Sequence, residues 1–300
     1  MIVVTAGKKY LDIDAYASML AYRELLRATT NEEVFAFSTT KVNQTVPPIL
    51  RKSKYQLDKM VNTADANFIL VDVSNPDFFD TFVDTGRILE IIDHHPGYEG
   101  YWKNHTAIKS QIETIGAVCT QIYERFVNAD RTDLLDKDLR KLLSAGILDN
   151  TINLKSKITT ERDHRAYSEL LKIGNLGQDW HKEYFRACEN EQFKDLKGAI
   201  LGDMKAEWVS PLLPEAIGQI ILFNREDINN EILSEVFSEY DKWIINVISL
   251  EDGRSYLYCD GKETKKGLEK LFGIKSNYDS LVVLDDFILR KELLKRAIGF

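Results

Sequence analysis

The sequence is poor in the features that mark secreted, membrane-bound and disulfide-rich proteins. Its 300 residues contain three cysteines, Cys119, Cys188 and Cys259, which lie far apart without a CxxC pair and so predict neither a disulfide framework nor a zinc ribbon. No apolar stretch approaches the roughly 20 residues that cross a bilayer. The N-terminal Met-Ile-Val-Val follows no basic region, so we expect no secretion signal and no membrane partner. A reducing, cytoplasmic location fits these absences best.

Positive charge is also scarce. The sequence has 39 lysines and arginines against 47 aspartates and glutamates, a net charge of -8, and it has no dense basic tract. Proteins that bind nucleic acid polymers depend on basic residues that neutralise phosphates, so we expect no such partner. The remaining composition, 44% hydrophobic and 29% charged, is that of a globular chain able to bury one large core or two medium ones.

The first half of the chain alternates short β-branched runs with helical segments. This alternation is typical of an α/β domain whose parallel sheet carries helices on both faces. The predicted strands are residues 2–5, 34–38, 68–71 and 88–92, and the predicted helices are 15–28, 116–127 and 139–148. Thr160, followed three residues later by Asp163, predicts the start of another helix through a variant of the capping box.

The sequence pattern changes between about residues 174 and 193, where charged and aromatic residues replace the periodic spacing of apolar residues. We interpret this segment as a domain join and expect two domains, 1–187 and 193–300. The second would be a smaller mixed α/β domain of about a hundred residues, a common domain size. Its predicted strands are 217–223, 243–249, 256–259 and 281–284, with helices near 227–237 and 265–272.

Acidic residues and histidines follow the predicted strands of the first domain. Asp12 and Asp14 lie at the start of the first helix, Asp72 follows the third strand, and residues 93–95 (Asp-His-His) follow the fourth. Asp149 closes a later helix. Because ligands of open α/β sheets bind beyond the carboxyl ends of the strands, we expect the residues at the strand ends to meet at one edge.

Such a cluster points to divalent metal ions. Neighbouring carboxylates repel one another unless positive charge compensates them, and a set of carboxylates with imidazole suits Mn²⁺, Co²⁺ or Zn²⁺ better than Ca²⁺. Two ions about 3.5–4 Å apart make a bridging water a strong nucleophile toward phosphorus. Taken singly, each aspartate is also explained as a helix cap or turn former. The adjacent His94 and His95 are more specific, since neighbouring side chains there can serve a metal and a substrate separately.

These residues resemble the four ordered motifs of the DHH phosphoesterase superfamily. Residues 113–120 are similar to the Glu-Pro-Val-Gly-Ser-Thr segment of the family II, manganese-dependent inorganic pyrophosphatases, and 159–163 to their Thr-Thr-Glu-Lys-Asp. Residues 203–205, 217–220 and 289–291 resemble segments of their DHHA2 domain. The resemblance therefore covers almost the whole chain and implies a DHH domain followed by a DHHA2 domain, as in pyrophosphatases and exopolyphosphatases.

The resemblance implies a manganese-dependent phosphohydrolase that cleaves phosphoanhydride bonds of pyrophosphate or short polyphosphate with a metal-bridged water. Its expected partner is a small phosphorylated substrate. Assembly into a homodimer is a further possibility that the sequence does not decide. His95 would contact the phosphate and Asp93 would steady the site. The expected ligands of two Mn²⁺ ions, or of Co²⁺ or Mg²⁺, are Asp12, Asp14, Asp72, His94 and Asp149. The expected binding residues for the second phosphoryl group are Lys205, Arg290 and Lys291.

Two departures keep alternatives open. The family begins Gly-His-x-x-Pro-Asp-x-Asp, whereas this chain has Lys8 in place of the metal-binding histidine. An ammonium cannot ligate a metal, so one metal position loses a ligand. That position would bind its ion weakly, exchange it, or be filled by the lysine charge. Glu292 also stands where a further lysine is usual. The alternatives are a phosphodiesterase or nucleoside-polyphosphate hydrolase of the same superfamily, or a catalytically impaired module that binds metal and phosphate. The DHH phosphodiesterases with a Gly-Gly-Gly-His motif are disfavoured, because this sequence has no Gly-Gly pair.

Overall fold

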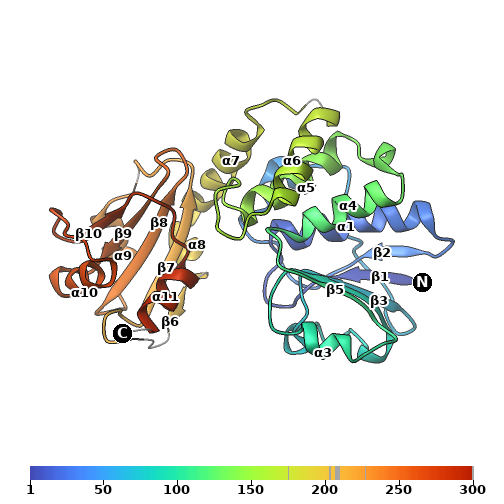
Figure 1. Cartoon of the computed structure of the whole chain (residues 1–300), viewed down its shortest axis with the longest axis horizontal. Helices are drawn as coiled ribbons and strands as arrows, with labels where there is room; N and C mark the ends of the chain where they lie inside the picture. Colours follow the sequence, from blue (N-terminus) through green and yellow to red (C-terminus); the bar gives the residue numbers. More distant parts are fainter. Residues whose placement is uncertain (175, 203, 207–209, 227, 299–300) are drawn as a thin grey trace. The chain divides into compact units, whose positions relative to one another are not determined.

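The computed structural model describes residues 1–174, 176–202, 204–206, 210–226 and 228–298. The chain divides into two compact units, Met1–Tyr184 and Phe185–Phe300. Each unit is built around a sheet of its own (Figure 1).

Unit 1 contains a parallel sheet in the order β2-β1-β3-β4-β5. Its strands are β1 (Ile2–Thr5), β2 (Val34–Ala36), β3 (Asn67–Val71), β4 (Ile88–Asp93) and β5 (Lys109–Ile112). The first four confirm the strands predicted from continuous apolar runs. Strand β5 was not predicted, because it lies at the sheet edge and its sequence Lys-Ser-Gln-Ile is polar and half exposed. An edge strand needs less apolar surface than a central one, so the sequence gives little sign of it.

Helices cover both faces of this sheet, as predicted. Figure 1 shows α1 (Ile13–Thr29) and α4 (Val118–Asn128) on one face and the short α3 (Glu99–Lys103) on the other. Helix α1 packs against α4 and α5 (Lys137–Asn150), and α5 packs against α6 (Glu161–Gly174). The short helix α2 (Pro48–Arg51) and three 3₁₀ turns, Pro76–Phe78, Thr85–Arg87 and Thr132–Leu134, complete the unit.

Side-chain caps fix where helices α1 and α6 begin. The Asp12 carboxylate accepts a hydrogen bond from the Ala15 backbone N–H (3.0 Å), so it acts as the N-cap of α1. The helix predicted to start at Thr160 is also present. The Asp163 carboxylate reaches back to accept from the Thr160 N–H (2.8 Å) and hydroxyl (2.7 Å), and α6 follows at once.

The segment interpreted as a domain join, where the sequence pattern weakens, is largely helical. Helix α7 spans Trp180–Lys194, and the division between the two units falls within it. Trp180, Tyr184 and Cys188 recur every four residues and are all buried. These large side chains form the apolar stripe of a helix, which the surrounding charged residues obscured in the sequence.

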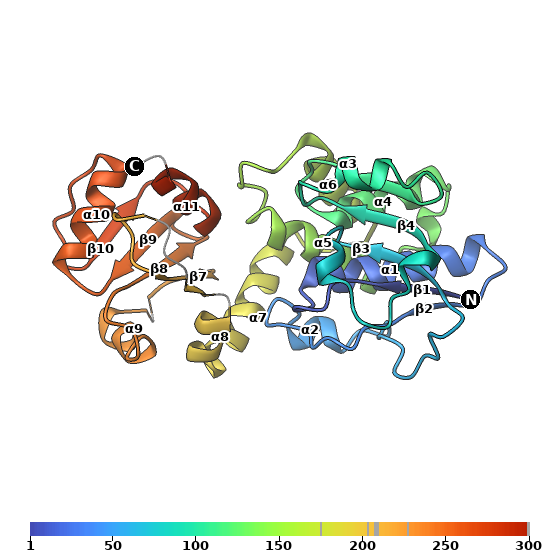
Figure 2. The ribbon, with the colours of Figure 1, turned by 90° about the horizontal axis from the view of Figure 1, so that it is seen from below.

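Unit 2 is a mixed α/β domain, as predicted. Its sheet has the order β10-β9-β8-β7-β6, in which only β7 and β8 pair in parallel. The strands are β6 (Lys205–Ala206), β7 (Ala216–Leu222), β8 (Trp243–Ser249), β9 (Arg254–Cys259) and β10 (Leu281–Leu284). Figure 2 shows α9 (Asn230–Val236) on one side and α10 (Lys262–Phe272) and α11 (Arg290–Ile298) on the other, and each side has its own buried core. Helix α8 (Leu196–Gly202) packs on β7.

The structure also bears on the cysteines and on membrane spans. All three cysteines are buried, and no disulfide joins them. Across the part of the chain that is described, no helix combines the length and apolar character needed to cross a bilayer.

Candidate metal centre

The strand ends of unit 1 place aspartate and histidine side chains beside one another. Asp72 follows β3, its N–H donates to the Ile92 carbonyl (2.9 Å), and its backbone φ is 59°. Aspartate adopts this left-handed conformation more readily than most residues other than glycine, so Asp72 suits the turn that follows β3. Asp93 ends β4, and His94 and His95 follow it.

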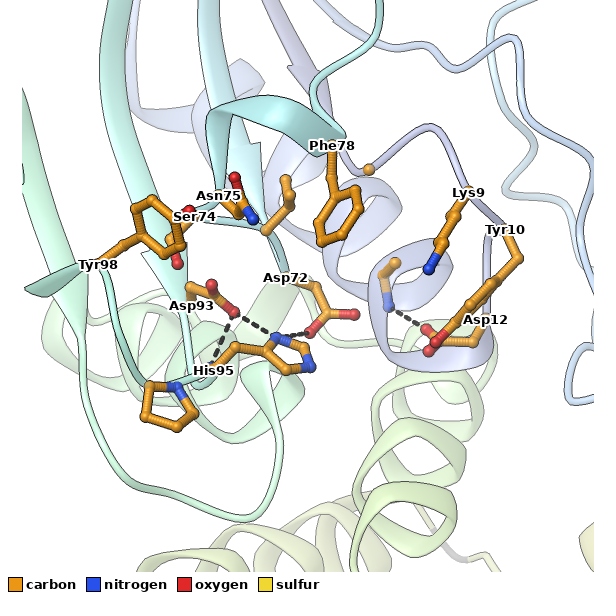
Figure 3. A pocket seen from close by; sticks show the side chains of 14 residues that line it. Lys9, Tyr10, Asp12, Asp72, Ser74, Asn75, Phe78, Asp93, His95 and Tyr98 are labelled. Carbon is orange, nitrogen blue, oxygen red and sulfur yellow. Dashed lines mark hydrogen bonds and ion pairs between the residues drawn. The ribbon is translucent and has the colours of Figure 1, made fainter. Parts of the chain in front are cut away.

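Asp72 and the two histidines form a group that can hold a metal ion. The distance from Asp72 Oδ1 is 3.4 Å to His94 Nε2 and 3.7 Å to His95 Nδ1. One ligand atom from each of the three residues lies within 4.8 Å of the others. Figure 3 shows the Asp72 carboxylate facing the His95 ring. The predicted convergence at the carboxyl ends of β3 and β4 is therefore present in the fold.

Neighbouring groups orient both imidazole rings. His94 Nδ1 lies 3.1 Å from the Ile115 carbonyl, which fixes the proton on Nδ1 and leaves Nε2 toward Asp72. His95 Nδ1 lies 2.8 Å from Asp93 Oδ1, and this fully buried carboxylate also accepts from the backbone N–H groups of His94 (2.7 Å) and His95 (3.2 Å). Asp93 thus holds the ring of His95, whose side chain is 62% exposed.

The first residues of α4 hold Asp14. The fully buried Asp14 carboxylate accepts from the backbone N–H groups of Val118 (2.8 Å) and Cys119 (2.7 Å) at the N-terminus of α4. That terminus carries partial positive charge and favours an anion. The loop just before α4 supplies the Ile115 carbonyl to His94, so this loop and the start of α4 position two of the predicted metal ligands together.

Asp163 and Gly116 fix this loop. The buried Asp163 carboxylate accepts from the Gly116 N–H (3.0 Å) and from the Thr120 hydroxyl (2.6 Å). A Cβ atom added at Gly116 would lie 2.5 Å from Thr151 Cγ2 and 2.7 Å from Asp163 Oδ2, so only glycine fits here. The two motif segments at residues 113–120 and 159–163 therefore meet behind the site.

Asp149 is held by a residue that the sequence did not indicate. Its Oδ1 accepts from the Tyr184 hydroxyl (2.9 Å), which also lies 3.0 Å from the Thr45 carbonyl. Tyr184 comes from α7, and only the packing of that helix brings its hydroxyl to Asp149. Beyond the helix that carries Asp149, residues 152–154 have consecutive φ values of 48°, 55° and 62°. Such strain clusters at functional sites.

Burial and mutual repulsion perturb the carboxyl groups. Burial, with the charges of Asp72 and Asp14, raises the pKa of Asp12 well above its usual value. Burial and the Asp72 charge raise the pKa of Asp14 to about 6, and burial raises the pKa of Asp149 to about 7. Although burial alone lowers the pKa of His94, its interaction with Asp72 raises it to about 10. Crowded negative charge of this kind calls for cations, and carboxylate oxygens with imidazole nitrogens fit a divalent ion such as Mn²⁺.

A cavity of about 350 Å³ opens onto this group. Asp12, Asp72, Asp93 and His95 line it, together with residues that the sequence did not single out: Lys9, Tyr10, Ser74, Asn75, Phe78 and Tyr98 (Figure 3). Lys8 is not among the lining residues, and its side chain is exposed. This placement does not support the alternative in which the Lys8 charge occupies the position of a metal ion.

The basic residues predicted to bind substrate belong to unit 2. Arg290 begins α11, and its backbone N–H donates to Gln219 Oε1 (2.6 Å). Lys205 lies in β6 and Lys291 in α11, but their side chains, like residue 203, lie outside the described part of the chain. Glu292, which replaces a usual lysine, accepts from the Leu289 N–H (2.9 Å) ahead of α11.

The fold and the grouped aspartates and histidines define a class of protein. Residues 2–147 match the DHH family, N-terminal domain. Unit 1 therefore carries a DHH-family domain, which confirms the resemblance found in the sequence motifs.

The individual relatives are similar over nearly the whole chain. A manganese-dependent inorganic pyrophosphatase of Methanothrix thermoacetophila is 26% identical over 291 residues, which covers 93% of this chain and 92% of the relative. Among solved structures, a candidate family II inorganic pyrophosphatase of Methanococcus jannaschii superposes with a TM-score of 0.63 at 21% identity and covers 100% of both chains. An exopolyphosphatase-related protein of Bacteroides fragilis has a TM-score of 0.53 at 15% identity and covers 98% of this chain and 89% of its own. The two-unit α/β fold of the family II pyrophosphatases is therefore the fold of this chain.

Proposed function

We propose that this protein is a manganese-dependent phosphohydrolase that cleaves the phosphoanhydride bonds of pyrophosphate or short polyphosphate. The observation that carries the proposal is the group formed by Asp72, His94 and His95. Asp12 and Asp14 interact electrostatically with Asp72, and Asp149 interacts with Asp12 and Asp14. The name of the Methanothrix relative supports pyrophosphate as the substrate. We also propose a cytoplasmic location, which agrees with three buried cysteines that form no disulfide.

Two divalent ions are part of this proposal. Their ligands would be Asp12, Asp14, Asp72, His94 and Asp149. When bound, the ions would polarise phosphoryl oxygens and lower the pKa of water near neutrality. Mn²⁺ fits the mixed oxygen and nitrogen donors, with Co²⁺ and Mg²⁺ as alternatives.

The protein groups would orient the substrate and stabilise charge. His95, with Nδ1 held by Asp93, presents Nε2 for a hydrogen bond to a phosphoryl oxygen, and such a donor strengthens as negative charge develops. The carboxylate of Asp93 stabilises the charged form of His95, because the hydrogen bond to Asp93 raises the pKa of His95. Lys205, Arg290 and Lys291 remain the proposed binding residues for the second phosphoryl group.

Aromatic side chains in the cavity favour a second candidate substrate. Phe78 is 40% exposed, and both Phe78 and Tyr98 line the cavity beside His95. Exposed rings beside a phosphate site can stack on a flat organic group. A nucleoside polyphosphate or a phosphodiester is therefore the second candidate.

Phosphate release by the metal-stripped protein tests the proposal. Mn²⁺, Co²⁺ or Mg²⁺ would be added with pyrophosphate, tripolyphosphate, long polyphosphate, ATP or a chromogenic phosphodiester, and bound metal would be counted. We expect Mn²⁺-dependent release that Asp72→Asn and His94→Ala abolish, whereas Asp133→Asn, at an exposed aspartate, leaves it unchanged. Release from ATP or the phosphodiester alone would favour the second candidate. Absence of release from all five substrates with metal bound would leave only a binding module.

A further inference from the structure

The loop between β1 and α1 sends two neighbouring lysines in different directions. The Lys8 backbone N–H donates to the Phe78 carbonyl (2.9 Å), which fixes the loop against the 3₁₀ turn that ends at Phe78. Both lysine side chains are exposed, but Lys9 lines the cavity together with Asp12 and Asp72, whereas Lys8 does not. Figure 3 shows the Lys9 amine pointing into the space between Phe78 and Asp12.

The Phe78 ring supports the Lys9 side chain. The ammonium lies 5.0 Å from the ring centroid, within the range of a cation–π interaction. A lysine whose alkyl chain packs on an apolar surface keeps its ammonium accessible to solvent. Phe78 therefore limits the positions available to this ammonium and keeps it in the cavity.

Lys9 is the one lysine or arginine among the described residues that line the cavity. Three acidic residues, Asp12, Asp72 and Asp93, line the same cavity. Even so, within the described ranges of the chain its ammonium makes no ion pair within 4 Å, and its contact is with the Phe78 ring. A cation that shares a cavity with carboxylates without pairing to one is available to another anion.

We propose that Lys9 binds the phosphoryl group of the substrate that lies at the metal centre. The inference rests on the proposed phosphohydrolase function, and it gives unit 1 a phosphate-binding cation separate from Lys205, Arg290 and Lys291. A lysine ammonium is a compact point charge that suits phosphate oxygens. At this position it would offset the repulsion between the anionic substrate and the aspartates of the same cavity.

The adjacent lysine supplies a matched control. Lys9→Met keeps an unbranched apolar side chain against Phe78 and removes the charge, Lys9→Arg keeps the charge, and Lys8→Met removes a neighbouring charge outside the cavity. The measurements are the KM for tripolyphosphate, the affinity of the Mn²⁺-loaded protein for inorganic phosphate by calorimetry, and the Mn²⁺ content. We expect Lys9→Met to raise the KM and to lower the phosphate affinity by about tenfold or more, which is the size of a lost charge-assisted hydrogen bond. Lys9→Arg should restore most of this loss, Lys8→Met should change neither value more than about twofold, and Mn²⁺ content should stay constant.

The outcomes separate this inference from the proposed function. If the wild type binds phosphate without hydrolysing any substrate, and Lys9→Met alone weakens that binding, the role of Lys9 stands and the hydrolase proposal fails. If Lys9→Met and Lys8→Met behave alike, the assignment of Lys9 is wrong even in an active enzyme. A wild type that neither binds phosphate nor hydrolyses a substrate would overturn both.

Discussion

Replacing Asp149 with asparagine should stabilise the metal-free protein and reduce the stabilisation that Mn²⁺ provides. Burial, with the charge of Asp14, raises the pKa of Asp149 from 3.8 to about 7, although the Tyr184 hydroxyl opposes this shift. The folded state therefore holds a proton that the unfolded state has lost between pH 4 and 7. The stability present at low pH is thus lost as the pH rises through 7. At 1.36 kcal/mol per pKa unit, the ionised group costs on the order of 4 kcal/mol at pH 8.

Asparagine removes this charge and can still accept from the Tyr184 hydroxyl. Its own buried amide recovers less than the full amount, so we expect the metal-free variant to gain on the order of 2 kcal/mol at pH 8. That gain raises the midpoint of thermal unfolding by roughly 4–8 °C for a domain of this size. With saturating Mn²⁺ the wild type gains stability from bound metal, about 2.7 kcal/mol at a hundredfold excess over Kd, and the variant should lose much of this gain.

Thermal unfolding in a chelator and in Mn²⁺, each at pH 5 and pH 8, measures both effects. The metal-free wild type should unfold at a lower temperature at pH 8 than at pH 5, and Asp149→Asn should flatten this difference. Asp133→Asn, at an exposed aspartate, is the control and should follow the wild type. If Asp149→Asn lowers the midpoint by the same amount with and without metal, the ionised Asp149 carboxylate does not destabilise the metal-free folded state, and the reasoning is refuted.

Three further changes test how the site is held. Gly116→Ala should destabilise the fold by about 1–3 kcal/mol and lower Mn²⁺ affinity about tenfold, because the segment that orients Asp14 and His94 must move. Thermal unfolding and metal titration measure the two effects, and an unchanged Mn²⁺ affinity would contradict the prediction. Tyr184→Phe removes a hydrogen bond that lowers the pKa of Asp149, so Mn²⁺ affinity should fall more at pH 6 than at pH 8, and an equal fall would argue against the contact. Mn²⁺ binding should release a proton even at pH 8, because the pKa of His94 is raised to about 10, and calorimetry in buffers of different ionisation enthalpy should find this release missing in His94→Gln.

The central strands and the site residues attached to them were predictable because both depend on local sequence. Residues 2–5 and 68–71 are continuous apolar runs, as expected where a strand is buried on both faces, and β1 and β3 lie there. Asp72 and Asp93 could be placed at one edge because parallel strands bring their carboxyl ends together. Helix α7 was missed because its buried Trp180 stands among charged residues, and the polar β5 was missed because an edge strand buries little.

The sequence alone determined the parallel sheet, the order of the acidic and histidine motifs, and their resemblance to the DHH superfamily, since each of these is written in consecutive residues. The tertiary structure decided which side chains meet. It brought the Tyr184 hydroxyl to Asp149, tied the loop at Gly116 to Asp163, and turned Lys9 rather than Lys8 into the cavity. These contacts depend on how helices pack and how a loop turns, and neither can be predicted from neighbouring residues in the sequence.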